Sequence, residues 1–250
     1  MKNNIKIFFL SATTFLLIFS FFLFINIFFS GVVFKNIPVY IIFLFVICFT
    51  AFLSSYLSYE RFKISKELGM LFISFVSYSF GFTFALHAIA APEVTQFGEA
   101  VFDVTEHYGP MLSPIIFSIL VLPFRGSKEI LYENAKKIFF IMTLAMSLVF
   151  VVLAYFSYIA DFLEKNVNLI AVLPTGIFFL AAFYILFKKY IASNDQLTFY
   201  IILSLSVFAN SSIIPFFYNE WNLVWWYFNA VFLIGFIILL FGLFKPERRQ

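Results

Sequence analysis

The sequence contains little charge. Only 12% of its 250 residues are Asp, Glu, Lys or Arg, whereas 63% are hydrophobic and the mean hydropathy is +1.01. A soluble domain carries about 25% charged residues, so there is too little polar surface here to cover a water-soluble globule. The apolar residues come in runs of about 20, the length at which a helix crosses about 30 Å of hydrocarbon. The composition therefore predicts an all-helical membrane bundle, with residues 1–250 forming a single domain.

Cysteine and histidine are also scarce. Cys48 is the only cysteine, which excludes an intrachain disulfide and a cysteine metal cluster. The two histidines, His87 and His107, are too few for a multi-haem cytochrome b. No His-Glu-x-x-His motif, phosphate-binding loop or nucleic-acid-binding pattern is present, and every lysine lies in a loop or at the end of a predicted span, where it could not hold retinal. These absences disfavour an enzyme, and we expect no nucleic-acid partner.

Charges, prolines and glycines divide the chain into eight predicted transmembrane helices. Backbone groups in hydrocarbon must satisfy one another, and within a single segment only a helix achieves this. The fourth segment is short and is interrupted or bounded by Pro110, Pro114 and Pro123. The charged stretch 127–133 begins with a candidate cap, Ser127, and is predicted to be a short surface helix. The eight segments are 6–29, 38–59, 68–91, 107–124, 138–160, 168–187, 197–217 and 223–244.

The basic residues give this topology a direction, because cytoplasmic loops are enriched in Lys and Arg. With the N-terminus inside, only Lys35 and Lys165 fall in outer loops. The sequence therefore predicts that both termini are cytoplasmic, in what we expect to be a prokaryotic inner membrane. The inner segments contain Lys2, Lys6, Arg61, Lys63, Lys66, Arg125, Lys128, Lys136, Lys137, Lys188, Lys189, Lys245, Arg248 and Arg249.

On this topology, most polar residues of the spans fall in the outer half. One interpretation assigns the aromatic residues to the interfacial belt and the amides to hydrogen bonds between helices. The other is a polar pocket that opens to the outside. Because no Asp, Glu, Lys or Arg lies in the middle of a span, the pattern favours binding over ion conduction. The candidate ligand-binding residues are His87, Asn210, Asn229, Trp225, Trp226, Tyr155 and Tyr158.

A metal site is a further candidate on the outer side. Residues 97–108 alternate apolar and acidic positions at helical spacing, which predicts an amphipathic helix on the outer membrane surface. Neutral imidazole with carboxylates suits Zn, Cu or Fe, and haem ligation by the two histidines is an alternative. A histidine that senses pH is a third possibility. The candidate metal ligands are His87, Asp103, His107 and Glu106, although nothing in the sequence requires a cofactor.

Residues 77–82 (SYSFGF), residues 86–92 (LHAIAAP) and the Trp225-Trp226 pair resemble a known class of membrane domain. They are similar to the multi-helix sensor modules of bacteria, the MASE-type and seven-helix input domains of histidine kinases and diguanylate cyclases. The resemblance covers the third and last predicted spans. Such modules feed a cytoplasmic output domain, whereas this sequence stops six residues after its last predicted span. The resemblance therefore implies either a stand-alone sensor subunit or a sensor cut before its output domain.

Three functions are consistent with these observations. The first is a sensory or regulatory bundle that binds a ligand or ion from the outside. Its basic inner face would contact a cytoplasmic signalling partner, a second copy of the chain or anionic lipid headgroups of the bilayer. The second is a small transporter or permease for a neutral or lipophilic substrate. The third is a membrane redox or metal-binding protein that uses His87 and His107.

Overall fold

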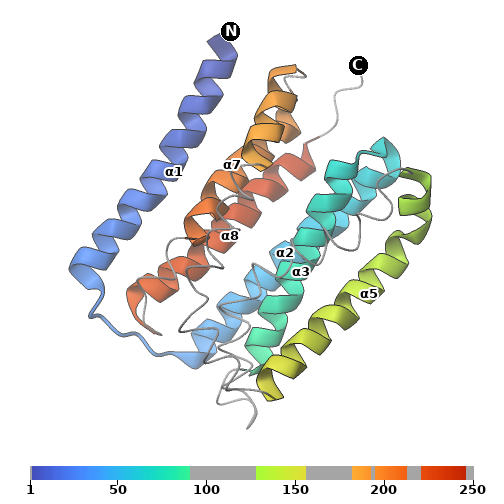
Figure 1. Cartoon of the computed structure of the whole chain (residues 1–250). Coiled ribbons are helices and arrows are strands. Elements are labelled where there is room, and N and C mark those ends of the chain that lie inside the picture. Colours follow the sequence, from blue (N-terminus) through green and yellow to red (C-terminus); the bar gives the residue numbers. More distant parts are fainter. Residues whose placement is uncertain (1, 91–127, 156–181, 193–194, 213–220, 246–250) are drawn as a thin grey trace. The chain divides into compact units, whose positions relative to one another are not determined.

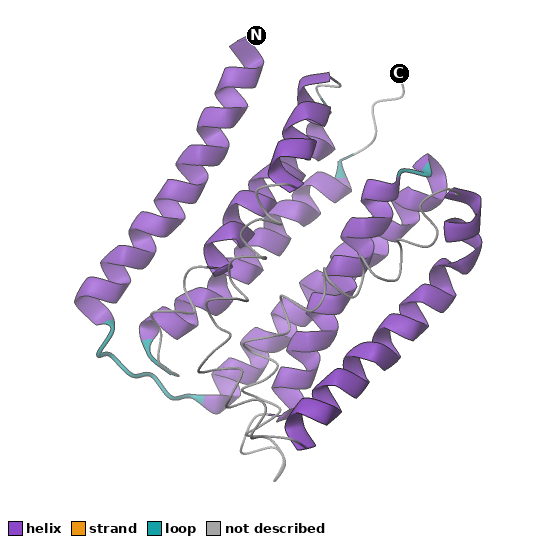
Figure 2. Cartoon of the chain, in the orientation of Figure 1, coloured by secondary structure: helices purple, strands orange, loops and turns teal. Residues whose placement is uncertain are grey.

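The computed structural model describes residues 2–90, 128–155, 182–192, 195–212 and 221–245. Apart from a single isolated bridge, the regular structure in these residues is helical (Figure 1, Figure 2). The elements are α1 (Lys2–Phe29), α2 (Ile37–Ser65), α3 (Leu68–Ala90), α5 (Lys128–Tyr155), a helix over 182–192, α7 (Gln196–Phe208), the 3₁₀ turn η2 (Ala209–Ser212) and α8 (Leu223–Phe244).

Four of the described helices are long and apolar enough to cross a membrane. They cover Ile7–Phe29, Ile37–Ser65, Leu68–Ile89 and Leu223–Phe244, and a shorter apolar helix covers Gln196–Ser211. The fold is therefore compatible with an integral membrane protein. The prediction of an all-helical chain is confirmed for the described residues.

The chain divides into two compact units, Met1–Tyr40 with Asn168–Gln250 (unit 1) and Ile41–Val167 (unit 2). In unit 1, α7 and α8 approach each other closely along a line of small residues. A Cβ added to Gly242 would lie 2.5 Å from Tyr200 Cβ, and one added to Gly235 would overlap the Phe208 ring. Between these positions the Ser204 hydroxyl donates to the Gly235 carbonyl at 2.8 Å. Small residues and hydroxyl hydrogen bonds are the usual means of helix association where no water is present.

Helix α1 packs against α7 and α8 along one narrow stripe. Ile7, Ser11 and Phe22 are buried, and Phe15 and Ile18 between them are half-buried, which is the spacing of a single helix face. The Tyr227 hydroxyl of α8 donates a hydrogen bond to the Ile18 carbonyl of α1 at 2.6 Å. The other faces of α1 carry exposed apolar residues, among them Phe8, Phe9, Leu16, Leu17, Phe21, Ile27 and Phe28.

Unit 2 is held together by buried hydroxyl groups. Ser74 of α3 donates to the Ser55 carbonyl of α2 at 2.8 Å. On another face of α3, the Tyr78 hydroxyl lies 2.8 Å from Thr143 Oγ1 of α5. The Phe75 and Phe139 rings, with centroids 4.1 Å apart, continue the contact between α3 and α5. Because residue numbers rise together along both helices at these contacts, α3 and α5 run in the same direction.

Two helices extend further than the predicted spans. The charged stretch 127–133 was predicted to be a short surface helix, but α5 runs without a break from Lys128 to Tyr155. Similarly, α2 continues to Ser65, where Lys66 adopts φ 55° and its N–H bonds to the Phe62 carbonyl, a left-handed helix end. The predicted surface helix at 97–108 and the predicted span at 107–124 lie outside the described residues, as does most of 168–187.

The contact between α7 and α8 can be tested by adding a single methyl group. We expect Gly242→Ala to lower the free energy of unfolding by about 1–3 kcal/mol, because the rigid Tyr200 Cβ cannot move aside without shifting α7. Gly69→Ala is the matched control, since nothing lies within 4 Å of a Cβ at Gly69.

Thermal unfolding in detergent measures the difference. The single cysteine, Cys48, is buried in the folded chain, so a dye that fluoresces on reacting with thiols reports unfolding directly. Equal Tm values for the two variants would show that the close approach of α7 and α8 does not limit stability.

Candidate functional site

One end of unit 1 is closed by a short backbone junction between the 30–36 loop and the start of α8. Val33 and Asn222 form an antiparallel bridge. The Phe34 N–H donates to the Trp221 carbonyl at 2.8 Å, and the Leu223 N–H donates to the Val32 carbonyl at 3.1 Å. Trp221 adopts φ 64° at this junction, a left-handed conformation that residues with a side chain seldom take. The junction therefore fixes the connection after α1 against the beginning of α8.

Aromatic rings pack around this junction. The centroids of Tyr40 and Trp225 are 4.4 Å apart, and those of Trp221 and Trp225 are 4.9 Å apart. The Trp226 indole N–H donates to the Phe34 carbonyl at 2.9 Å. We call Phe34, Tyr40, Trp221, Trp225 and Trp226 the aromatic cluster, and the end of unit 1 where they lie the aromatic end. All three tryptophans of the chain belong to this cluster.

Asn222 connects the junction to both neighbouring helices. Its side-chain oxygen accepts the Trp225 N–H at 2.8 Å and thereby caps α8, while its Nδ2 donates to the Ser30 carbonyl at 3.3 Å, just beyond α1. Only 1% of this residue is exposed. Asn222 was not among the residues predicted from the sequence. An Asn directly before an apolar run predicts a helix cap, but no sequence pattern predicts its contact with Ser30, 192 residues away.

Asn210 and Asn229 are both buried, with exposures of 0% and 2%. In the antiparallel pair α7–α8, Ser204 contacts Gly235, so this register places Asn210 and Asn229 at the same level. Both amides donate to their own helices, Asn210 Nδ2 to the Ser206 carbonyl at 3.1 Å and Asn229 Nδ2 to the Trp225 carbonyl at 3.0 Å. The side-chain oxygen of Asn210 is also buried, and it has no hydrogen-bond partner among the residues that the structure describes.

The two predicted tryptophans are part of the aromatic packing. Trp225 is fully buried against Tyr40 and Trp221, and the indole N–H of the half-buried Trp226 is already bonded to Phe34. Trp225 and Trp226 lie about one turn along α8 from Asn229, so their rings are next to the level at which Asn210 and Asn229 lie. The structure therefore brings Asn210, Asn229 and Trp225 into one region of unit 1.

His87 belongs to unit 2. It is 2% exposed on α3, one turn after Thr83, whose buried hydroxyl has no partner. Tyr155 is the last residue of α5, and its side chain is not among those described. Tyr158, Asp103, Glu106 and His107 lie outside the described residues.

The predicted metal site thus stays a prediction. Within the described part of the chain, no group of three His, Cys, Asp or Glu residues is placed to hold a metal ion. Of the four predicted ligands, only His87 falls in that part.

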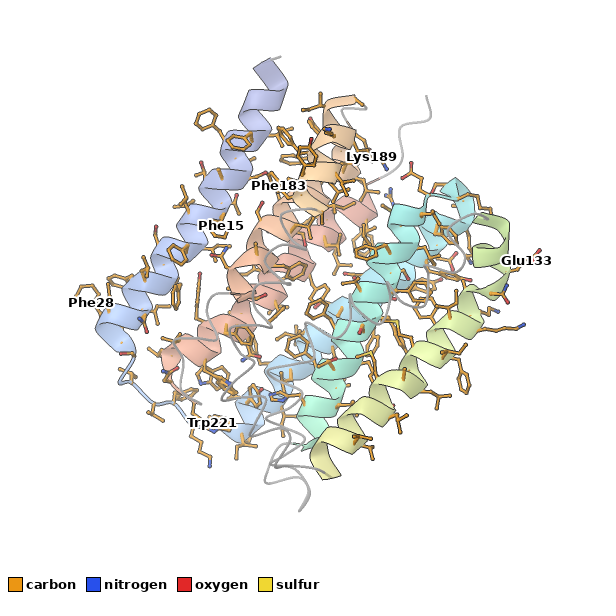
Figure 3. All side chains as sticks on the ribbon, in the orientation of Figure 1. Phe15, Phe28, Glu133, Phe183, Lys189 and Trp221 are labelled. Carbon is orange, nitrogen blue, oxygen red and sulfur yellow. The ribbon has the colours of Figure 1, made fainter. Side chains whose placement is uncertain are left out.

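The other end of unit 1 carries lysines beside tyrosine rings, and we call it the basic end. Lys188 Nζ lies 4.5 Å from the Tyr184 ring centroid, and Lys245 Nζ of α8 lies 4.7 Å from that of Tyr200 on α7. Burial raises the pKa of the nearby Tyr190 phenol, and the Asp195 carboxylate raises it further, so this phenol stays neutral at physiological pH. Figure 3 shows Lys189 at this end and Trp221 at the opposite end of unit 1.

No known protein family matches the chain, and no curated protein or solved structure matches it either. The resemblance to bacterial sensor modules therefore stays a prediction, and the function must be argued from the residues themselves.

The role of Asn222 can be tested through the tryptophans. We expect Asn222→Ala to shift Trp emission to longer wavelength and to destabilise the protein by about 1 kcal/mol or more, because the α8 cap and the Ser30 contact are lost together. Since every Trp lies in the aromatic cluster, the emission reports on this end alone.

Asn36→Ala is the control for that variant. Asn36 Oδ1 accepts the Val39 N–H at 3.2 Å near the start of α2, but in an exposed position and without a second contact of this kind. The same emission spectrum for Asn222→Ala and Asn36→Ala would contradict the structural role of Asn222.

Proposed function

We propose that the chain is an integral protein of a prokaryotic inner membrane with eight spans and both termini in the cytoplasm. The direction of the helices supports this topology. Because α3 and α5 run in the same direction, the end of α3 and the start of α5 lie at opposite ends of unit 2. The predicted fourth span would connect these two ends.

The charge distribution supports the same topology. In unit 1, Lys188, Lys189 and Lys245 lie at the basic end, whereas Lys35 lies beside Trp221 at the aromatic end. In unit 2, the last turns of α2 and the turn before α3 carry Arg61, Lys63 and Lys66. Lysines and arginines are retained on the cytoplasmic side, and tryptophans prefer the interface. The basic end would then face the cytoplasm and the aromatic end the outside.

Cysteine labelling tests this topology. In a Cys48→Ser background, we expect Gly31→Cys to react with a membrane-impermeant maleimide on intact cells, and Glu67→Cys and Ala192→Cys to react only after permeabilisation. All three positions are exposed, and 67 and 192 lie on the same side only if an even number of spans separates them. Labelling of 67 and 192 from opposite sides would overturn the eight-span topology.

We further propose that the bundle binds a small neutral ligand from the outside and acts as a sensor or regulator. The observation that carries this proposal is the unpartnered Asn210 Oδ1. A buried acceptor without a donor costs about 1–3 kcal/mol, so such atoms call for a functional explanation. Here the helix also changes from α7 to the 3₁₀ turn η2 at Ala209, directly before this residue. A ligand that donates one hydrogen bond would satisfy Asn210.

The chemistry of the surroundings limits the ligand class. Asn229 lies at this level, and Trp225 and Phe228 are buried within one turn of it along α8, so these groups offer no charge to balance an ion. An uncharged molecule with one N–H or O–H group and an apolar body fits these groups. The signal would leave through the basic end, where a cytoplasmic partner or a second copy could bind.

Matched ligands and matched variants test the site. Phenol and indole carry a donor, whereas anisole and N-methylindole have a similar shape without one. We expect the donors alone to raise the Tm of the wild type and of Asn229→Leu, by about 2–4 °C for each kcal/mol that binding adds to the free energy of unfolding, and to leave the Tm of Asn210→Leu unchanged.

Asn229→Leu controls for lost helix contacts, because both variants remove an amide bond to the carbonyl four residues earlier. The thiol-reactive dye again reports unfolding through Cys48. If phenol and anisole act alike on the wild type, or if the donors still stabilise Asn210→Leu, the ligand site is not at Asn210.

A further inference from the structure

The helix over 182–192 has one packed face and one free face. Phe183, Leu186, Phe187 and Tyr190 pack in a cluster with Ile7 of α1 and Ile202 of α7. The free face carries Tyr184, Ile185, Lys188 and Ile191, all exposed. Along this face, an aromatic and an aliphatic side chain precede a lysine in the direction of the basic end.

Lys188 and Lys63 each lie over the ring of a tyrosine four residues earlier, but they differ in their ion pairing. Lys63 lies 5.6 Å from the Tyr59 ring and also forms an ion pair of 2.6 Å with Glu60. Lys188 lies closer to its ring, at 4.5 Å from Tyr184, and forms no ion pair with any residue that the structure describes. Its ammonium group is therefore open to an anion from outside the described part of the chain.

We propose that Tyr184 and Lys188 form a headgroup site for an anionic phospholipid. The phosphate would accept hydrogen bonds from Lys188 Nζ, whose position the Tyr184 ring holds, and an acyl chain would lie along Ile185 on the same face. Ile185 precedes Lys188 in the direction of the basic end, which is the order of acyl chain and headgroup in a phospholipid. This proposal rests on the membrane location proposed above.

Lipid binding to the purified full-length chain tests the site. Native mass spectrometry in detergent would compare phosphatidylglycerol with phosphatidylcholine of the same acyl chains. We expect the wild type to bind phosphatidylglycerol more tightly and Lys188→Gln to lose about fivefold in affinity for it, since one basic residue near a charged membrane surface contributes about that factor. Lys188→Arg should keep the preference, and Tyr184→Leu should weaken it.

Lys63→Gln is the matched control and should bind phosphatidylglycerol as the wild type does, because Glu60 already neutralises Lys63. Equal binding of the two lipids by the wild type would overturn the proposal. So would a loss in Lys63→Gln that equals the loss in Lys188→Gln, because the effect would then be one of general charge. Competition by inorganic phosphate at the same concentration would show that free phosphate, not lipid, is the occupant.

Failure of the lipid-binding test can be distinguished from failure of the proposed membrane location. A protein outside the membrane would be recognised by its absence from the membrane fraction of cells and by its labelling pattern. A protein in the membrane without a lipid preference would contradict the headgroup site alone.

Discussion

The close approach of α7 and α8 is the contact on which the rest of unit 1 depends. Gly235 and Gly242 let the two backbones come together, and the Ser204 hydroxyl bonds across them to the Gly235 carbonyl. In hydrocarbon, burying apolar side chains between helices gains little over contact with lipid, so packing and hydrogen bonds must supply the stability. The register of this pair also decides which residues share a level. Helix α1 then packs on the completed pair along a single stripe.

The two ends of unit 1 are built differently. At the aromatic end, backbone hydrogen bonds, the Asn222 side chain and five packed rings join the connection after α1 to the start of α8. At the basic end, lysines lie over tyrosine rings, and Lys188 forms no ion pair with any described residue. Asn210 and Asn229, the candidate ligand-binding residues, lie nearer the aromatic end than the basic end. Any change that a ligand causes there would have to reach the basic end along helix axes.

Helix positions were predicted well where apolar runs end at charges or turn residues. The segment 223–244 coincides with α8, and 68–91 differs from α3 by a single residue. The helix at 127–133 was predicted, but its unbroken continuation into the next span was not, because a charged stretch leaves no hydropathy signal. Asn210 and Asn229 were identified from the sequence as polar residues in apolar surroundings. The sequence did not show that each amide bonds to its own helix. Asn222 was missed because its role depends on a partner 192 residues away.

That separation in sequence has a consequence for biosynthesis. The partners of α1 in α8 follow it by about two hundred residues, as the hydrogen bond from Tyr227 to Ile18 illustrates with a separation of 209. If the chain enters a membrane as it is translated, α1 is inserted long before its partners in α7 and α8 have been made. Its side chains are apolar on nearly all sides, and Ser11 is the one hydroxyl among the residues named on its packing stripe, so contact with lipid costs it little. During this period the packing stripe of α1 would be open to capture by another chain.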